Sequence, residues 1–339
     1  MTSPASCRRL RKRLGLGAFG LLTTALCPPV WGQPQPMVVT LLGTGTPTPR
    51  IERLGPSTLV EAGGQRLVFD VGRGTTIRLQ QIGIRLGDVT GVFITHFHSD
   101  HTNGIPDLWL TGWLSSSFGG RQAPFRIWGP RGTKALMDGL EKAYQADVTI
   151  RLVDQGLPRE GIAIAATDFA GESVVFDEGG VAVTAFLVDH GEHIKPAYGY
   201  RVQYGQRSVV ISGDTRYSEN LIKHAKGADL LLHEVAPAPA EGRDRPEVKS
   251  VLDHHTSAAE AGRVFAQVRP RLAVLTHMVG SGFAAASSRA VAERAALDAA
   301  LAGARQEYAG PLEMGEDLMR LVLGETVEVK RFDHQRRSY

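Results

Sequence analysis

The chain downstream of residue 36 alternates short apolar runs with segments of helical periodicity. Runs rich in Val, Leu and Ile, most of them bounded by glycine, predict β-strands. The clearest runs are MVVTLLG (37–43), RLVFDVG (66–72), GVFIT (91–95), RSVVISGD (207–214) and LAVLTH (272–277). Apolar residues three and four positions apart predict helices in TTIRLQQIGI (75–84), TKALMDGLEKAYQ (133–145) and TSAAEAGRVFAQV (256–268). Strand-like runs and helical segments alternate in both halves of the chain. This pattern predicts an α/β fold with two sheets packed face to face and helices outside. The segment from about 145 to 180 is weakly patterned and is predicted to be a surface excursion.

The first 32 residues have the three-part pattern of a secretory signal. Five basic residues and no acidic one lie between 8 and 13, an apolar stretch covers Leu14–Cys27, and Gly32 offers a small residue for cleavage. The apolar stretch is shorter than the ~20 residues of a spanning helix. We therefore expect a signal peptide at 1–32, cleaved near Gly32, and a single domain at 33–339. The mature protein would be periplasmic or secreted, with no stable membrane span; an uncleaved anchor is the alternative.

Removal of this segment changes the charge and the cysteine content. Five of the 38 Lys and Arg residues leave with it, so 33 remain against 35 Asp and Glu, a net charge near −2. Such a chain has no bulk attraction for nucleic acid. Cys7 and Cys27 are the two cysteines of the chain and both lie in the segment. A metal site in the mature protein must therefore consist of His, Asp and Glu.

The histidines gather where predicted strands end. Three of the eleven histidines lie within the seven residues of THFHSDH (95–101). The other strand-end positions are occupied by His190, Asp214, His233 and His277. The carboxyl ends of strands in an α/β fold converge on one rim, where ligands bind. His and carboxylate side chains are ligands for Zn²⁺, Mn²⁺ or Fe²⁺ when thiolates are absent. A simple helix cap at Ser99 or Asp100 is the alternative, but it leaves the three histidines unexplained.

THFHSDH resembles the HxHxDH signature of the metallo-β-lactamase-fold hydrolases, and further motifs follow in the order of that family. They are LLGTGTP near the mature start, FDVGRG with Asp70, VDHGEHIKPAYGYRV with His190, ISGDT with Asp214, HEV with His233 and Glu234, HHTS with His255, and LTH with His277. The resemblance covers nearly the whole mature chain. It implies the αββα four-layer sandwich of the metallo-β-lactamase type.

The resemblance also implies a dinuclear metal site. We expect two Zn²⁺ per chain, with Mn²⁺ or Fe²⁺ as alternatives. The implied ligands are His96, His98 and His190 for one metal, Asp100, His101 and His277 for the other, and Asp214 as the bridge. Two metals ~3.5–4 Å apart lower the pKa of a shared water and supply a hydroxide nucleophile. Asp100 is assigned to the catalytic residues as well. Asp70 is implied to orient a ligand histidine, with a turn aspartate as the alternative.

His255 and Glu234 are the two other residues to which the resemblance assigns a catalytic role. In the ribonuclease Z branch and in zinc-dependent arylsulfatases, a histidine of this type assists the leaving group and the glutamate orients it. A cationic histidine suits a phosphate or sulfate ester, whose leaving oxygen develops negative charge. His254 is the alternative to His255. A lactonase-type carbonyl hydrolase could use the same metals and would not need this histidine.

The expected substrate is a small aryl or alkyl sulfate ester, with a ribonuclease Z-like phosphodiesterase or a lactonase as alternatives. The predicted export, the slightly negative mature charge and the lack of a basic Gly- and Pro-rich arm argue against RNA. LGTGTPTPRIERLGPSTLVEAGG (42–64) and DLWLTGWL (107–114) resemble the arylsulfatase-like branch. We therefore expect no nucleic-acid partner; a homodimer remains open. Trp109 and Trp113 are expected in the core, with a substrate wall as the alternative. Of Tyr198 and Tyr200, one is expected to face the site.

Overall fold

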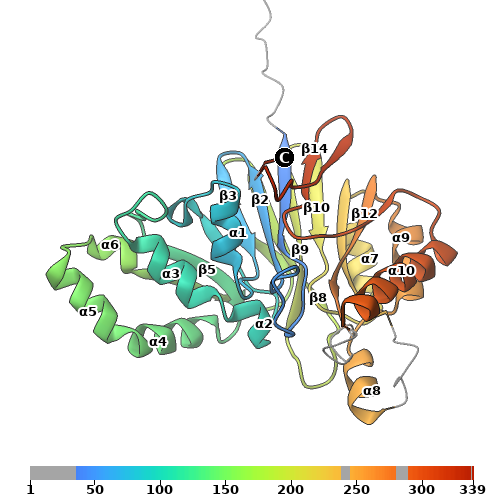
Figure 1. Cartoon of the computed structure of the whole chain (residues 1–339), viewed down its shortest axis with the longest axis horizontal. Coiled ribbons are helices and arrows are strands. Elements are labelled where there is room, and N and C mark those ends of the chain that lie inside the picture. The colour runs from blue at the N-terminus through green and yellow to red at the C-terminus, as the bar shows by residue number, and fades with distance from the viewer. Residues whose placement is uncertain (1–35, 238–244, 280–288, 337) are drawn as a thin grey trace, which may run out of the picture. The chain divides into compact units, whose positions relative to one another are not determined.

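Two β-sheets pack face to face, and helices cover their outer faces (Figure 1). The computed structural model describes residues 36–237, 245–279, 289–336 and 338–339. This architecture confirms the αββα fold predicted from the sequence. The predicted signal peptide at 1–32 lies outside the described residues. Cleavage near Gly32, the domain boundary and the export expected from this segment therefore stay predictions. In the described part of the chain, no helix has the length and apolar character that crossing a membrane requires.

The first sheet contains both antiparallel and parallel strands. Its order among the described residues is β15-β14-β1-β2-β3-β4-β5-β6. The bounds are β1 Met37–Gly43, β2 Ser57–Ala62, β3 Gln65–Phe69, β4 Gly91–Phe93, β5 Phe125–Pro130, β6 Ile164–Phe169, β14 Arg320–Leu323 and β15 Val327–Lys330. Strands β3 to β6 are parallel to one another, so the carboxyl ends of β3, β4 and β5 lie at one edge.

The second sheet has the order β13-β12-β11-β10-β9-β8-β7 in the described chain. The bounds are β7 Ser173–Glu178, β8 Val181–Val188, β9 Ala197–Tyr204, β10 Arg207–Ile211, β11 Leu230–Val235, β12 Leu272–Met278 and β13 Leu312–Met314. Strands β7 to β10 form an antiparallel meander, whereas β10 to β13 are parallel. The loops after β8 and β10 and the end of β12 carry ligand candidates.

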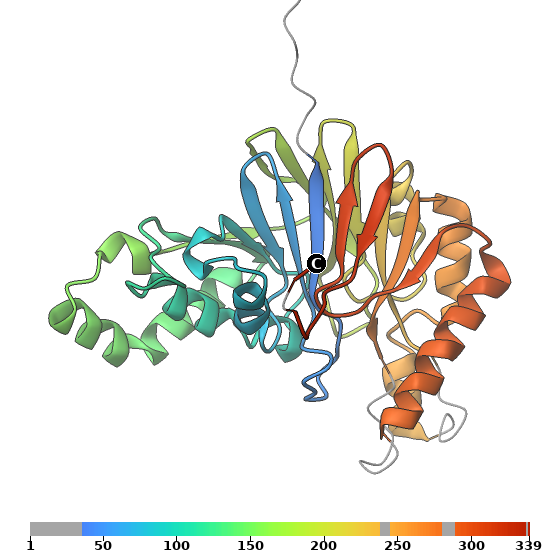
Figure 2. The same cartoon turned by 45° about the horizontal axis from the view of Figure 1, so that its top comes forward.

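Helices cover the outer face of each sheet, as Figure 2 shows from a second direction. On the first sheet they are α1 Thr75–Gln81, α2 Ser99–Thr102, α3 Ile105–Trp113, α4 Thr133–Ala143, α5 Gln145–Asp154 and α6 Arg159–Ile162, with the short 3-10 helix η1 Leu86–Asp88. The second half of the chain adds α7 Glu219–Ala225, α8 Pro246–Leu252, α9 Ala258–Val268 and α10 Arg289–Glu307. Helix α9 begins with a capping box between Ser257 and Glu260, which pairs the free backbone N–H groups of its first turn.

The strands are apolar on both faces because each sheet is buried on both sides. In β10, Val209 and Ile211 lie in the core between the sheets, whereas Val210 packs in the core beneath α7 and α9. Successive side chains of a strand point to opposite faces, so the two cores draw on alternate residues. This explains why the runs read as continuous apolar segments rather than as polar and apolar alternation.

Two sequence-based predictions about elements are wrong. The segment 145–180 is not a surface excursion, because it supplies β6 and β7, the terminal strands of the two sheets. These strands are half-exposed, so their apolar pattern is weak. Tyr198 and Tyr200 both lie in the core between the sheets, so neither faces the site. The hydroxyl of Tyr200 donates to the carbonyl oxygen of Ile94 at 2.6 Å.

Trp109 and Trp113 are core residues, as expected. They are 0% and 1% exposed and pack between α3 and the first sheet. Each indole N–H donates to a backbone carbonyl, that of Ile162 at 2.9 Å and that of Pro158 at 2.8 Å. The tryptophans therefore fasten α3 to the α6 region and do not line a substrate site.

Candidate metal centre

All seven predicted ligands meet at one edge of the two sheets. His96 and His98 lie in the loop after β4, and Asp100 and His101 follow in α2. His190 follows β8, Asp214 follows β10, and His277 lies near the end of β12. Both sheets thus contribute, because the carboxyl ends of β4, β8, β10 and β12 open onto the same edge. The seven residues form two groups of metal-capable side chains.

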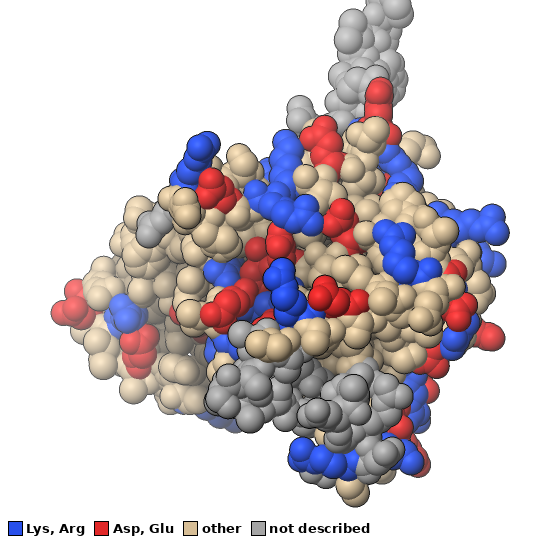
Figure 3. Space-filling model, turned by 45° about the vertical axis from the view of Figure 1, so that its right-hand side comes forward, with Lys and Arg blue, Asp and Glu red and all other residues tan. Residues whose placement is uncertain are grey.

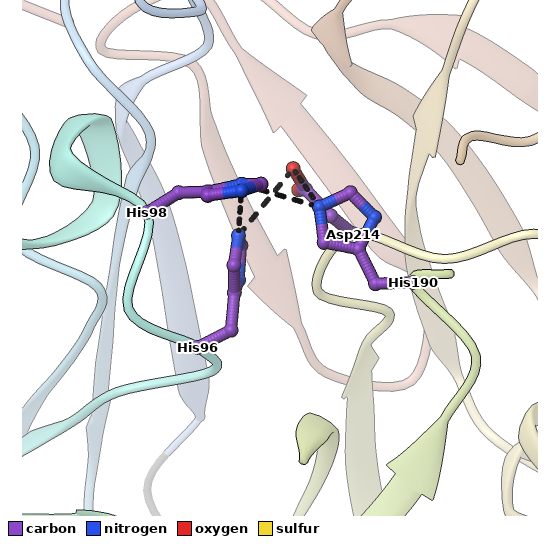
Figure 4. A group of neighbouring side chains, drawn as sticks. All are labelled: His96, His98, His190 and Asp214. Atoms are coloured by element: carbon purple, nitrogen blue, oxygen red, sulfur yellow. Dashed lines mark hydrogen bonds and ion pairs between the residues drawn. The ribbon is translucent and has the colours of Figure 1, made fainter. Parts of the chain in front are cut away.

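The first group consists of His96, His98, His190 and Asp214 (Figure 4). Nδ1 of His98 lies 3.0 Å from Nε2 of His96 and 3.3 Å from Nε2 of His190. Oδ2 of Asp214 lies 3.9 Å from Nε2 of His96 and 3.7 Å from Nε2 of His190. The ligand atoms therefore converge on one point from different elements.

The second group consists of Asp100, His101 and His277. The Nε2 atoms of the two histidines are 3.2 Å apart, and Oδ2 of Asp100 lies 3.4 Å from that of His277. Oδ2 of Asp214 is 3.4 Å from Nε2 of His101 and 3.5 Å from Nε2 of His277. One carboxylate oxygen thus faces both groups, which is the placement that a bridging ligand requires.

Hydrogen bonds on the far side of the rings fix which nitrogen faces the centre. Nδ1 of His101 donates to Asp70 at 2.7 Å, and Nδ1 of His190 donates to the carbonyl oxygen of His254 at 3.0 Å. Nδ1 of His96 lies 3.0 Å from the hydroxyl of Thr95, which itself donates to Asp70. The Nε2 lone pairs of neutral rings held in this way point inward.

The spacing of the donor atoms fits a divalent cation. Two nitrogen ligands at 2.0–2.1 Å from a tetrahedral zinc ion are ~3.3 Å apart. The nitrogen pairs of the two groups are separated by 3.0–3.3 Å. Facing lone pairs at that distance repel unless a proton or a cation lies between them. The seven residues could therefore hold divalent metal ions.

Burial and charge set the protonation of the ligands. Burial lowers the pKa of His96 well below its usual value and that of His190 to about 4. Burial alone would raise the pKa of Asp214, but His277 and His101 hold it well below its usual value. Burial lowers the pKa of His101, but the charges of Asp214 and Asp70 outweigh burial and raise this pKa well above its usual value. A bound divalent cation displaces such a proton, so metal binding would release it.

Asp70 connects two ligand-bearing segments. Besides His101, its carboxylate accepts hydrogen bonds from the backbone N–H and the hydroxyl of Thr95, both at 2.8 Å. Its backbone has a φ of 57°, a conformation that non-glycine residues adopt infrequently. These contacts match the orienting role implied by the resemblance rather than that of a turn aspartate.

His255 lies beside the ligands and is paired with Glu234. Its Nδ1 is 3.1 Å from Oε1 of Glu234, and its ring centroid is 4.9 Å from that of His190. Burial lowers the pKa of His255, but the carboxylate of Glu234 more than offsets this and raises it to about 9. His254 is half-buried, and among the described residues no carboxylate is hydrogen-bonded to its ring. Of the two neighbouring histidines, His255 is thus the one held as a cation next to the ligands.

His233 does not belong to the site, contrary to its strand-end position in the sequence. It lies inside β11, is fully buried, and packs edge-on against Phe265 of α9. Because neighbouring side chains of a strand point to opposite faces, Glu234 faces the centre and His233 faces the helix layer.

Two further residues brace the site and carry no sequence signal. The side chain of Asp317, which is 5% exposed, accepts hydrogen bonds from the backbone N–H and the hydroxyl of Thr44. It also accepts from the Leu54 N–H and from the guanidinium of Arg78. It thereby ties down the β1–β2 loop. Arg216 contacts Asp189 and the carbonyl oxygen of Asp253. Their partners are distant in sequence, so no local pattern reveals them.

Comparison with known proteins identifies the family. The family model described as "Beta-lactamase superfamily domain" matches residues 66–278. Ribonuclease Z of Mycobacterium marinum is 33% identical over 284 residues, which cover 84% of this chain and 97% of that protein. The chain therefore belongs to the beta-lactamase superfamily, in its ribonuclease Z-like branch.

Solved structures show the same fold. The metallo-beta-lactamase fold protein YhfI from Bacillus subtilis superposes with a TM-score of 0.62 at 19% identity, over 85% of this chain and 100% of that chain. The short form of human tRNase Z superposes with a TM-score of 0.60 at 23% identity, over 85% of this chain and 99% of that chain.

These comparisons overturn two expectations. The arylsulfatase-like reading of the function is wrong, because the relatives matched over almost their whole length are ribonuclease Z enzymes. The expectation of no nucleic-acid partner is contradicted by the same relatives. The net charge of a whole chain says little about one site, and the same ligands suit phosphate and sulfate esters alike. The coarser prediction of a metal-dependent hydrolase acting on ester bonds is supported.

Proposed function

We propose that the protein is a metal-dependent phosphodiesterase that cleaves RNA. The observation that carries the proposal is the His255–Glu234 pair, held at 3.1 Å beside both ligand groups. A phosphodiester sheds an alkoxide, which needs a proton, and a cationic histidine can supply it. The ribonuclease Z relatives give the substrate class. Transfer RNA precursors are the first RNA to test, because the human relative is named tRNase Z.

The proposed cofactor is a pair of zinc ions, with manganese or iron(II) as alternatives. His96, His98 and His190 would hold one ion, Asp100, His101 and His277 the other, and Asp214 would bridge them. Bound divalent cations supply Lewis acidity at the phosphoryl oxygens and lower the pKa of a nearby water. Six of the seven ligands are buried and His98 is exposed. Burial strengthens the interaction of those six ligands with charge.

The residues around the ligands have separate tasks in this proposal. His255 donates a proton from the ring edge that faces the centre, and Glu234 keeps that ring charged and fixed. Asp70 orients His101, and Asp100 provides a carboxylate ligand. Protonation of the leaving oxygen by a positioned group contributes typically ~10²–10⁴-fold to the rate.

A paired assay on purified, metal-analysed protein tests the proposal. The substrates are a transfer RNA precursor with a 3′ trailer, bis-nitrophenyl phosphate and nitrophenyl sulfate, each with and without a chelator. We expect chelator-sensitive cleavage of the two phosphodiesters. We further expect His255→Asn to lower RNA cleavage by ~10²-fold or more, whereas His254→Asn retains most of it. Turnover of the sulfate without the phosphodiesters would refute the proposal.

We also propose that residues 1–32 are removed and that the mature domain, 33–339, is exported; an exported enzyme would meet RNA outside the cytosol, so the transfer RNA precursor above serves as an assay substrate. The support is the basic, apolar and small-residue order of this segment. Intact mass and cell fractionation of the protein expressed in a bacterium test this. An uncut chain confined to the cytosol would contradict it.

A further inference from the structure

A small cavity lies between the sheets, directly behind the ligands. Its volume is about 40 Å³, and its polar lining includes Ser57, Asp70, Ser212, Glu234, Thr276 and His277. A water molecule occupies ~30 Å³ in the liquid and needs two to four polar partners when it is buried. The cavity therefore has the size and the lining for an ordered water.

Two of the lining residues each have a buried polar atom without a hydrogen-bond partner among the described residues. These atoms are Oε2 of Glu234 and Nδ1 of His277. The two side chains belong to residues that are 1% and 4% exposed. Buried polar groups are almost always paired, with protein or with ordered water. Two side chains that line the same cavity thus carry an acceptor and a donor for which the described part of the chain offers no partner.

The other end of each side chain is already committed. Oε1 of Glu234 receives hydrogen bonds from His255 Nδ1 at 3.1 Å, from Thr256 N at 3.0 Å and from Thr215 N at 3.2 Å. Nε2 of His277 faces Asp100 and Asp214 in the second ligand group. Neither side chain can turn to satisfy its free atom without giving up these contacts.

The strand register places the two side chains next to each other. Glu234 of β11 pairs with Thr276 of β12, and the register shifts directly afterwards, so that Val235 pairs with Met278. His277 is the extra residue and has a φ of 45°. Such irregularities re-aim a side chain beside an active site. Neighbouring strands are ~4.8 Å apart, a spacing that one water spans with two hydrogen bonds of ~2.9 Å.

We propose that a buried water in this cavity accepts a hydrogen bond from Nδ1 of His277 and donates one to Oε2 of Glu234. Glu234 then orients two groups at once: His255 directly, and the ligand His277 through the water. It is a positioning residue for both. The inference rests on the proposed function in one respect, the role of His255 as the acid.

A crystal structure of the zinc-loaded protein that resolves ordered water tests the site itself. The expected result is a water within ~2.7–3.2 Å of both atoms. A dry cavity, or a water that contacts only one of the two atoms, would overturn the proposal.

Zinc affinity without substrate tests the consequence. Glu234→Gln retains an oxygen for Thr215, Thr256 and His255 but presents an amide N–H₂ to the cavity, where the water can no longer donate. Loss of a supporting partner of a ligand histidine costs ~10–100-fold in metal affinity. We expect chelator competition to show that loss for one of two zinc ions in Glu234→Gln.

His255→Asn is the matched control, because it removes the imidazole bonded to Oε1 of Glu234 and leaves the Oε2 side, with the water, in place. We expect this variant to bind both zinc ions at least as tightly as the unaltered protein. Unchanged affinity in Glu234→Gln would overturn the water link. Failure of the proposed function would show separately, as unaltered protein that binds zinc and does not cleave RNA.

Discussion

The carbonyl oxygen of His254 accepts the Nδ1–H of His190 at 3.0 Å, so a ligand histidine is held by the residue adjacent to His255. Arg216 reinforces this connection. Its Nε donates to the carbonyl oxygen of Asp253, its backbone N–H donates to that of Asp189 at 2.7 Å, and its guanidinium lies 3.6 Å from the Asp189 carboxylate. Three loops that carry site residues therefore converge on one side chain.

Replacement of Arg216 should lower the turnover number more than it changes KM. Arg216→Met removes the hydrogen bond to the carbonyl oxygen of Asp253, so the loop that bears His255 is less well fixed. A misplacement of this kind costs up to ~10²-fold in rate. Arg216→Lys retains the charge near Asp189 and should recover part of the loss. Steady-state kinetics on RNA and on bis-nitrophenyl phosphate measure both variants. Equal loss in the Lys and Met variants would exclude a role for the charge.

Asp70→Asn should weaken metal binding without unfolding the protein. The amide has one acceptor oxygen, whereas the carboxylate accepts from Thr95 N, Thr95 Oγ1 and His101 Nδ1. We expect a ~10–100-fold loss of zinc affinity, measured by chelator competition. Asp138→Asn, on the exposed face of α4, is the control and should bind zinc normally. Wild-type affinity in Asp70→Asn would show that Asp70 only shapes the turn.

Asp317→Ala should strongly destabilise the fold. Asp317 and Arg78 form a buried ion pair with N–O distances of 2.9 Å and 3.1 Å. Removal of one partner leaves a buried charge unpaired, which costs ~3–5 kcal/mol. Urea unfolding measures the free energy of unfolding. The exposed pair of Lys134 and Asp138 is the control, since Asp138→Ala should cost ~0.5 kcal/mol or less.

RNA binding should depend only moderately on salt. Lys and Arg are interleaved with Asp and Glu on the face shown in Figure 3, and they form no continuous basic stripe there. Each phosphate contact to a single strand contributes ~0.7 to the slope of log K against log salt. We expect a slope no steeper than about −3, or roughly four contacts. A binding titration at several salt concentrations measures it, and a slope near −7 would reveal an extended basic surface.

The sequence predicted two packed sheets and an edge rich in His and Asp because both follow from local patterns, whereas the assignment of individual ligands came from the resemblance to the metallo-β-lactamase-fold hydrolases. Strand-like runs that end in His or Asp located the edge where His96, Asp214 and His277 meet. The brace at Asp317 could not be predicted, since its partners lie 239 to 273 positions away in the chain. The side of the sheet to which His233 points was predicted incorrectly, because neighbouring residues of a strand point to opposite faces and a shift of one position reverses the face.

The substrate class was predicted incorrectly for a different reason. The ligands and His255 suit any tetrahedral anionic ester, so the choice depended on the predicted export, on net charge, on a missing basic arm and on the likeness of two segments to the arylsulfatase-like branch. None of these features reports on the site itself. Identity spread over 97% of a ribonuclease Z sequence decided the branch.

The distribution of the ligands along the chain has a mechanical consequence. Four of them come from one half of the sequence, within residues 96–101, and three from the other half, at 190, 214 and 277. A metal pair held in this way would be a cross-link between the two sheets as well as the proposed reaction centre. Sliding of one sheet over the other would pull the ligands away from the cations. We therefore expect bound metal to make the sandwich rigid at this edge. We expect the two sheets to loosen independently only when no cation is bound.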